Sequence, residues 1–326
     1  MFEYIGIDVS KQTIQVFDGE KDNTFPNEPE LKAFDRFILN QKRKKNGEPA
    51  LIFEPTGPYS HYLKMYCVKH RIKAHILNPM QSAHFAKAKG NRSKTDKVDA
   101  RMLQSAHALL REEDFKVPYE SAIANQIGVY LLSSYLLTQM VTRLNNHLYA
   151  MRRFCHPDQA CQVLLESEQH QLEKTKEEMM KRALAWIQQD PLLSSKMAFL
   201  CSIPGVGNVT ALNLLYHFQK YPQANPNQLT SLAGLDPVTR VSGTSLHQRL
   251  KISKRGNPLL RRALYCAAMS GIRCNASLKE QYEALLARKK PKKVALVALM
   301  KQILLIGFAL YRNNRYYEER ERTKKN

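Results

Sequence analysis

Short apolar runs alternate with segments of helical periodicity over residues 1–115, and this alternation is the strongest constraint on the fold. The apolar runs lie at 4–8, 13–17, 50–54 and 73–77. The run at 13–17 alternates apolar and polar residues, as a half-buried strand does. Apolar residues at helical spacing lie at 31–40 and around 62–67. The order strand, strand, helix, strand, helix, strand, helix predicts a mixed α/β sheet covered by helices.

The pattern changes to long helices after residue 120. Apolar residues recur there at three- and four-residue steps, as on one face of a helix: Ile127, Leu131, Tyr135, Leu136, Met140, Leu144, Leu148 and Met151. A Cys-His-Pro-Asp break at 155–158 precedes a second helical segment, 163–189. We predict an antiparallel helical hairpin, a coiled-coil-like linker that spaces domains or assembles subunits. The rest is helical and basic, so we expect three domains: 1–118, 119–194 and 195–326.

The charge of the chain points to a polyanionic partner. Its 326 residues include 50 Lys and Arg against 29 Asp and Glu, a net charge of +21. Nucleic acid is the first candidate, because each neutralised phosphate releases a counterion. An anionic membrane surface is the second.

No segment predicts export or membrane insertion. The N-terminal residues lack a basic start and a long apolar run, so they predict a strand and not a signal peptide. The apolar stretch 294–310 is interrupted by Lys301 and is shorter than the roughly 20 residues of a membrane span, which favours a buried helix. Because the six cysteines form no CxxC pair or zinc spacing, we expect reduced, mostly buried thiols in a cytoplasmic protein.

Four carboxylates lie where a buried charge would be costly or where a helix begins. Asp8 and Glu54 each belong to an apolar run, and Asp96 and Asp99 share one face if their segment opens a helix. No other acidic residue lies between Glu54 and Asp96, although basic residues accumulate there. Four such oxygen donors suit Mg²⁺, or Mn²⁺, and a metal pair can assist phosphodiester cleavage. The alternative is that each carboxylate separately caps a turn or helix.

A small polar loop, 241–246, lies in a segment (237–279) without acidic residues. A serine there could attack a phosphate to leave a phosphoserine, while arginines stabilise the developing charge. The alternative is an ordinary loop on a DNA-binding face. The turn Ser202–Gly207 is similar to a helix-hairpin-helix, whose backbone N–H groups can bind phosphate; a plain helix-helix turn is the alternative. The predicted nucleic-acid contacts are Lys94, Arg101, Gly205, Gly207, Arg249, Lys251, Lys254, Arg255, Arg261 and Arg262.

Several motifs resemble the DEDD-type insertion-sequence transposases, a family that includes the Piv site-specific DNA invertase and RNA-guided bridge recombinases. The motifs are Tyr-Ile-Gly-Ile-Asp at 4–8, Glu-Pro-Thr-Gly-Pro-Tyr at 54–59, Lys-Thr-Asp-Lys-Val-Asp-Ala-Arg at 94–101, Leu-Ala-Gly-Leu-Asp-Pro at 232–237 and Ser-Gly-Thr-Ser at 242–245. The resemblance implies an RNase H-like (RuvC-like) N-terminal domain with its acidic tetrad at Asp8, Glu54, Asp96 and Asp99. It also implies a C-terminal transposase domain in which Ser242 is the nucleophile and Ser245 a weaker candidate.

The leading hypothesis is therefore a transposase or site-specific recombinase that cleaves and rejoins double-stranded DNA at element ends and target. The resemblance further implies a homo-oligomer (dimer or tetramer) and a guide RNA. The first alternative is a metal-dependent junction nuclease that uses the tetrad and water. The second is an actin-like ATPase or sugar kinase, which would need a further Gly-rich phosphate loop that the sequence lacks. The third is a non-catalytic nucleic-acid binder.

Overall fold

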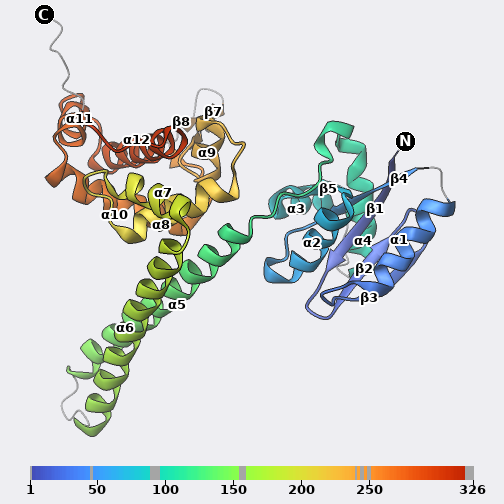
Figure 1. The fold of residues 1–326 in the computed structure, drawn as a ribbon, viewed down its shortest axis with the longest axis horizontal. Helices are drawn as coiled ribbons and strands as arrows, with labels where there is room; N and C mark the ends of the chain where they lie inside the picture. Colours follow the sequence, from blue (N-terminus) through green and yellow to red (C-terminus); the bar gives the residue numbers. More distant parts are fainter. Residues whose placement is uncertain are drawn as a thin grey trace, which may run out of the picture. The chain divides into compact units, whose positions relative to one another are not determined.

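A computed structural model of the chain describes residues 2–44, 47–88, 96–153, 159–238, 241–242, 246–247 and 251–319 (Figure 1). At 44, 96–97, 241–242 and 246–247 it describes the backbone alone. The chain forms two compact units, Met1–Glu120 and Ser121–Asn326. The finer division into three domains stays a prediction.

The first unit contains a five-stranded mixed sheet. Its strands are β1 (Phe2–Val9), β2 (Thr13–Phe17), β3 (Asp22–Pro26), β4 (Glu48–Phe53) and β5 (Lys73–Ile76), in the order β3-β2-β1-β4-β5. β1, β4 and β5 are parallel, whereas β2 and β3 run antiparallel to their neighbours. Between the expected strand 13–17 and the expected helix 31–40 we predicted no strand, and β3 shows that this was wrong. β3 is a polar edge strand without a buried position, so it lacks the apolar alternation that marks a half-buried strand.

Helices cover both faces of this sheet. Odd-numbered positions of β1 pack with α1 (Lys32–Lys44) and α2 (His61–His70). Even-numbered positions face α4 (Asp96–Ser105) and the cluster that includes α3 (Pro79–Ala88). This division follows from the alternation of side chains along a strand. Short 3₁₀ turns lie at Gly57–Ser60, Ala106–Leu109 and Glu112–Asp114.

The second unit begins with the predicted hairpin, which is confirmed. α5 (Ala122–Met151) and α6 (Gln159–Gln188) lie side by side (Figure 1). Ser121 caps α5 by accepting from the N–H of Ala124. Exposed apolar side chains at three- and four-residue steps form a row along one face of α5: Val129, Leu132, Leu136 and Met140.

The remainder is mainly helical. It contains α7 (Pro191–Cys201), α8 (Asn208–Lys220), α9 (Pro226–Leu232), α10 (Pro258–Cys274), α11 (Ala276–Ala287) and α12 (Lys292–Asn313). Two short strand pairs, β6 (Pro237–Val238) with β9 (Lys251–Ile252) and β7 (Val241–Ser242) with β8 (Leu246–His247), lie between α9 and α10.

α12 is long and apolar enough to cross a membrane, but it contributes Leu299, Ile303 and Leu304 to the core of this unit. The prediction of a buried helix is therefore confirmed. The expectation of mostly buried thiols was wrong for the described cysteines, because Cys161, Cys266 and Cys274 are exposed and only Cys67 is buried. Cys266 and Cys274 are eight residues apart on α10, so they share its outward face.

Candidate active site and nucleic-acid interface

Asp8 and Glu54 lie at the carboxyl ends of two adjacent parallel strands. β1 and β4 pair with Ile7 opposite Phe53, so Asp8 is next in register to Glu54, the residue that follows β4. Both residues are half-buried. The carboxyl ends of parallel strands are a common position for ligand sites in α/β proteins.

The start of α4 reaches the same edge of the sheet. A Cβ placed on Gly6 would lie 2.1 Å from the carbonyl oxygen of Ala100, and the rings of Tyr4 and His107 stack with centroids 4.6 Å apart. As β1 proceeds from Tyr4 to Gly6, its contacts therefore move toward the beginning of α4. The direction of the helix brings its first turn, which includes half-buried Asp99, toward the Asp8 end of the strand.

Asp8, Glu54 and Asp99 are the described side chains of the predicted four-carboxylate centre. Within the described side chains, no group of three or more His, Cys, Asp or Glu residues could hold a metal ion. Asp96 begins α4, but its side chain lies outside the described set. The four-carboxylate centre stays a prediction, although its all-oxygen donor set has the chemistry that Mg²⁺ and Mn²⁺ prefer.

The predicted nucleophile lies in the second unit. The backbone of Ser242 belongs to β7, where it is paired with Leu246 of β8. Its side chain, like Ser245, Arg249 and Lys94, lies outside what the structure describes. The role of Ser242 stays a prediction.

Arg101 has a structural partner that the sequence did not predict. Its Nε donates to Asp22 Oδ1 over 3.1 Å, and Nη2 donates to the second carboxylate oxygen. The guanidinium also lies 5.2 Å from the centre of the Phe17 ring. The hydrogen bonds to Asp22 raise the pKa of Arg101. The residue therefore ties α4 to the β2–β3 hairpin, and its predicted contact with nucleic acid is untested.

Arg261 is also engaged inside the protein. Its Nη1 donates to the carbonyl oxygens of Ala233, at 3.0 Å, and Gly256, at 2.8 Å. At this point two chain segments cross closely: a Cβ on Gly256 would lie 2.0 Å from the carbonyl oxygen of Leu232. Burial lowers the pKa of Arg261. The guanidinium thus stabilises the crossing that precedes α10.

The other described cations of this segment face solvent. Lys251, Lys254, Arg255 and Arg262 are exposed. They follow the β7–β8 pair in the chain, and they are available to a polyanion. Backbone phosphates are the usual partners of such side chains, because contacts to phosphate position a protein without reading sequence.

The two glycines of the Ser202–Gly207 turn have different roles. Gly205 has a left-handed φ of 96°, and a Cβ there would lie 2.7 Å from the backbone of Gly271 on α10. It is therefore required for close packing. Gly207 is the N-cap of α8, has open space around it and provides no side-chain cap. The turn joins α7 to α8, an arrangement common to a helix-hairpin-helix and to a plain helix-helix turn, so the predicted helix-hairpin-helix and its phosphate contacts stay predictions.

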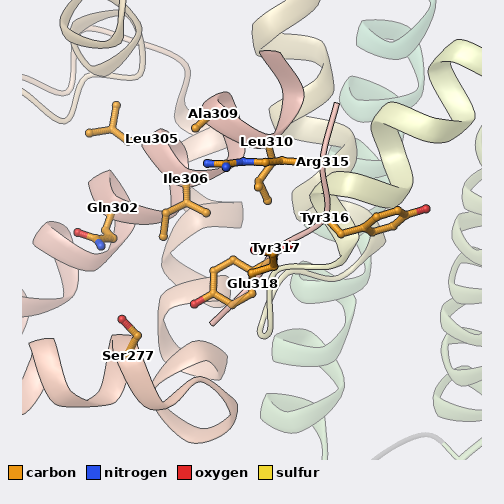
Figure 2. Close-up of a pocket in the computed structure, with 10 residues that line it drawn as sticks. All are labelled: Ser277, Gln302, Leu305, Ile306, Ala309, Leu310, Arg315, Tyr316, Tyr317 and Glu318. Carbon is orange, nitrogen blue, oxygen red and sulfur yellow. The ribbon is translucent and has the colours of Figure 1, made fainter. Parts of the chain in front are cut away.

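A second surface feature is a cavity of about 350 Å³ under the C-terminal tail (Figure 2). The tail residues Arg315–Glu318 lie over α12, and Leu305, Ile306 and Leu310 form much of the wall. Tyr317 is fixed by its N–H, which donates to Ser202 Oγ at 2.8 Å. None of the predicted site residues lines this cavity.

Family models match residues in both units. A family model for DEDD transposases of the IS110 type matches residues 5–157, and one described as the IS116/IS110/IS902 transposase family matches 197–283. The chain belongs to the DEDD-type insertion-sequence transposases. It is 25% identical to the pilin gene-inverting protein of Moraxella bovis, over 97% of this chain and 98% of that protein. It is 26% identical to the Moraxella lacunata protein of that name, again over 97% and 98%.

A third relative matches the chain over a shorter range. This is an uncharacterised 43.6 kDa protein of insertion element IS110 from Streptomyces coelicolor, 36% identical over 37% of this chain and 30% of that protein. With the two family models, these relatives identify the chain as a DNA transposase or recombinase enzyme. The predicted family and enzyme class are confirmed.

Proposed function

We propose that this transposase cleaves and rejoins DNA strands through Ser242, assisted by Mg²⁺ or Mn²⁺ held by Asp8, Glu54, Asp96 and Asp99. The observation that carries the proposal is the meeting of two parallel strand ends and the start of α4 at one sheet edge. Divalent cations there would neutralise the charge that develops on phosphate oxygens. The RNase H-like (RuvC-like) character of the sheet is part of the same proposal.

The serine step is a phosphoryl transfer. The Ser242 Oγ–P bond forms while one P–O bond to deoxyribose breaks, and the serine proton is lost as the leaving oxygen becomes a hydroxyl. Attack of a strand-end hydroxyl on the phosphoserine forms a new phosphodiester and restores the serine. No energy source is needed, because one phosphate ester replaces another. The exposed cations Lys251, Lys254 and Arg255 would position the backbone beside this loop.

The experiment compares Ser242→Ala, Ser245→Ala and Asp8→Ala in a recombination assay on plasmids carrying the element ends and target. We expect Ser242→Ala and Asp8→Ala each to abolish recombination while leaving DNA affinity within about twofold. Full activity of both variants would reject the assignment.

A trapping experiment separates this function from the nuclease alternative. A denaturation-resistant protein–DNA adduct that maps to Ser242 supports the recombinase. Strand cleavage with free 5′-phosphate ends, no adduct and no effect of Ser242→Ala would support hydrolysis by the carboxylates alone.

We also propose a homo-oligomer, a dimer or tetramer, and a guide RNA as partner. The exposed row on α5, with Leu132 at 63% and Leu136 at 56% exposure, supports assembly through the hairpin, since unpartnered apolar rows are unusual on monomers. Leu132→Glu with Leu136→Glu should reduce the mass measured by light scattering. RNA that copurifies with the chain and restores activity to nuclease-treated protein would support the guide, and activity without RNA would contradict it.

A further inference from the structure

A half-open cavity of about 350 Å³ lies in the second unit where the hairpin meets α8 and α10. Its polar and ionic lining includes Tyr135 of α5, Lys176 of α6, Thr210 and Asn213 of α8, and Arg262 and Cys266 of α10. Its volume is at the small end of the range for ligand pockets, roughly 300–1,000 Å³. None of the four predicted carboxylates and neither candidate serine lines it.

Two cations line the cavity. Arg262 lies over the ring of Tyr135, at 5.7 Å from its centroid, and half-buried Lys176 comes from the other helix of the hairpin. Among the described residues, neither cation is within ion-pair distance of a carboxylate. Two cations that line one cavity without an acidic partner favour an anionic ligand.

The first turn of α8 adds to this positive potential. Val209 and Thr210 line the cavity, and the helix has no side-chain cap at Gly207. The first backbone N–H groups of a helix have no acceptor within the helix, and they lie at the positive end of the helix dipole. An uncapped helix start is therefore suited to phosphate oxygens.

Asn213 indicates what else the ligand carries. This lining residue is only 3% exposed. Its Nδ2 donates to the carbonyl oxygen of Val209 at 2.8 Å, which fixes the amide orientation. Its Oδ1 is buried and has no hydrogen-bond partner within the described part of the chain. A buried acceptor without a donor is costly. The atom is covered by its neighbours, so a ligand with an N–H or O–H group would gain from meeting it once those side chains move aside.

We propose that this cavity binds one nucleotide unit. The phosphate contacts Lys176, Arg262 and the first turn of α8, and an N–H or O–H group of the base or sugar donates to Asn213 Oδ1. Inorganic phosphate satisfies the two cations alone, and a nucleoside satisfies Asn213 alone; a nucleotide carries both groups. The proposal does not depend on Ser242 or on the metal site.

Two cysteines of α10 provide a built-in test. Cys266 lines the cavity and is exposed, whereas Cys274 is exposed on the same helix and does not line it. The alkylation rate of each thiol by iodoacetamide is measured by mass spectrometry on the full chain, with and without millimolar deoxyadenosine or adenosine 5′-monophosphate. We expect several-fold slower alkylation of Cys266 and an unchanged rate at Cys274. Inorganic phosphate or adenosine alone should protect Cys266 less than twofold.

Variants then assign the protection to the cavity. Arg262→Ala and Lys176→Gln should each remove it, judged by the ratio of rates with and without nucleotide. Arg273→Ala on α10 and Lys181→Gln on α6, both exposed and outside the lining, should retain it.

The same protection assay with short single-stranded DNA and RNA oligonucleotides shows whether the bound nucleotide belongs to a DNA strand, to an RNA strand or to a free small molecule. Protection by one of the oligonucleotides at micromolar concentration assigns it to that strand; protection by the free nucleotide alone assigns it to a small-molecule site. Equal protection of Cys266 and Cys274, or protection that survives Arg262→Ala, would overturn the proposal. Ser242 does not line the cavity, so the alkylation rates should be the same in Ser242→Ala. The two proposals can therefore fail independently.

Discussion

Gly6 of β1 lies directly under Ala100 of α4, so closely that a Cβ on Gly6 would be 2.1 Å from the Ala100 carbonyl oxygen. The same Cβ would lie 2.3 Å from the backbone nitrogen of Gln104. These are backbone atoms, so no side chain can rotate away. The absence of a side chain at Gly6 is what lets α4 approach the sheet and brings its first turn toward the end of β1 that carries Asp8.

Gly6→Ala should therefore destabilise the first unit and abolish recombination. Overpacking of this kind costs about 1–3 kcal/mol, and more where backbone must move. The free energy of unfolding is measured by urea titration with circular dichroism. Gly207→Ala is the matched control, because Gly207 has open space around it and an ordinary φ of −90°; its cost should stay below about 1 kcal/mol. A Gly6→Ala chain of unchanged stability would show that the helix does not approach this closely.

Substitution of Arg261 should affect mainly the stability of the protein, and substitution of its neighbour Arg262 should affect mainly the binding of nucleic acid. Arg261→Ala leaves the carbonyl oxygens of Ala233 and Gly256 without this donor, which should lower the free energy of unfolding by about 1–3 kcal/mol. Arg262→Ala removes an exposed side chain whose printed contact is with the ring of Tyr135, so it should change stability by about 1 kcal/mol or less.

The two variants should also differ in salt dependence. Arg262→Ala should reduce the slope of log affinity against log salt by about one phosphate contact, measured with a labelled DNA duplex. The opposite assignment, with Arg261→Ala stable and Arg262→Ala unfolded, would contradict the geometry.

The sequence predicted those elements whose pattern is local. The apolar runs that became β1, β2, β4 and β5 were found because buried strands are marked by their own residues. β3 was missed because a polar edge strand is stabilised by its pairing with β2 and not by burial. The hairpin was found because two long helical segments flank one break.

The partners of the candidate site residues could not be predicted in the same way. Arg101 looked like a nucleic-acid contact because its partner Asp22 is 79 residues away, on the strand that was missed. Arg261 looked free because its acceptors are backbone carbonyls, which every residue has. Asn213 carried no signal, since a mid-helix asparagine is ordinary until its burial is known. For Gly6 a signal was present: a glycine inside a strand often marks a close backbone approach.

Tyr317 should hold the C-terminal tail against the helical core. Its hydroxyl accepts from Asn275 Nδ2 at 3.1 Å, and Asn275, only 2% exposed, caps α11. Tyr317→Phe leaves that buried amide without an acceptor and should cost about 1–3 kcal/mol. Tyr316→Phe is the control, because the described hydrogen bonds do not involve its hydroxyl and its ring is exposed. Thermal denaturation compares them, and equal stability of the two variants would exclude a latch at Tyr317.

His217 should make the second unit less stable in mild acid. Its ring is fully buried, Nε2 lies 3.2 Å from the carbonyl oxygen of Leu229, and Nδ1 has no partner within the described residues. Burial lowers the pKa of His217 from 6.5 to about 4. The unfolded chain therefore binds this proton more readily than the folded chain between these two values. The contribution of neutral His217 is complete above about pH 6.5 and is lost progressively as the pH falls to about 4.

At 1.36 kcal/mol per pKa unit, the loss across this window is about 3 kcal/mol, and about 2 kcal/mol of it should occur between pH 6.5 and 5. His217→Gln keeps an amide that can donate to Leu229 and does not titrate. The measurement is the free energy of unfolding in urea at pH 7 and pH 5 for both chains. The parent chain should lose about 2 kcal/mol more than His217→Gln, because only it must suppress protonation of a buried ring in order to stay folded. Parallel pH profiles for the two chains would show that His217 reaches solvent or an acidic partner in the folded state.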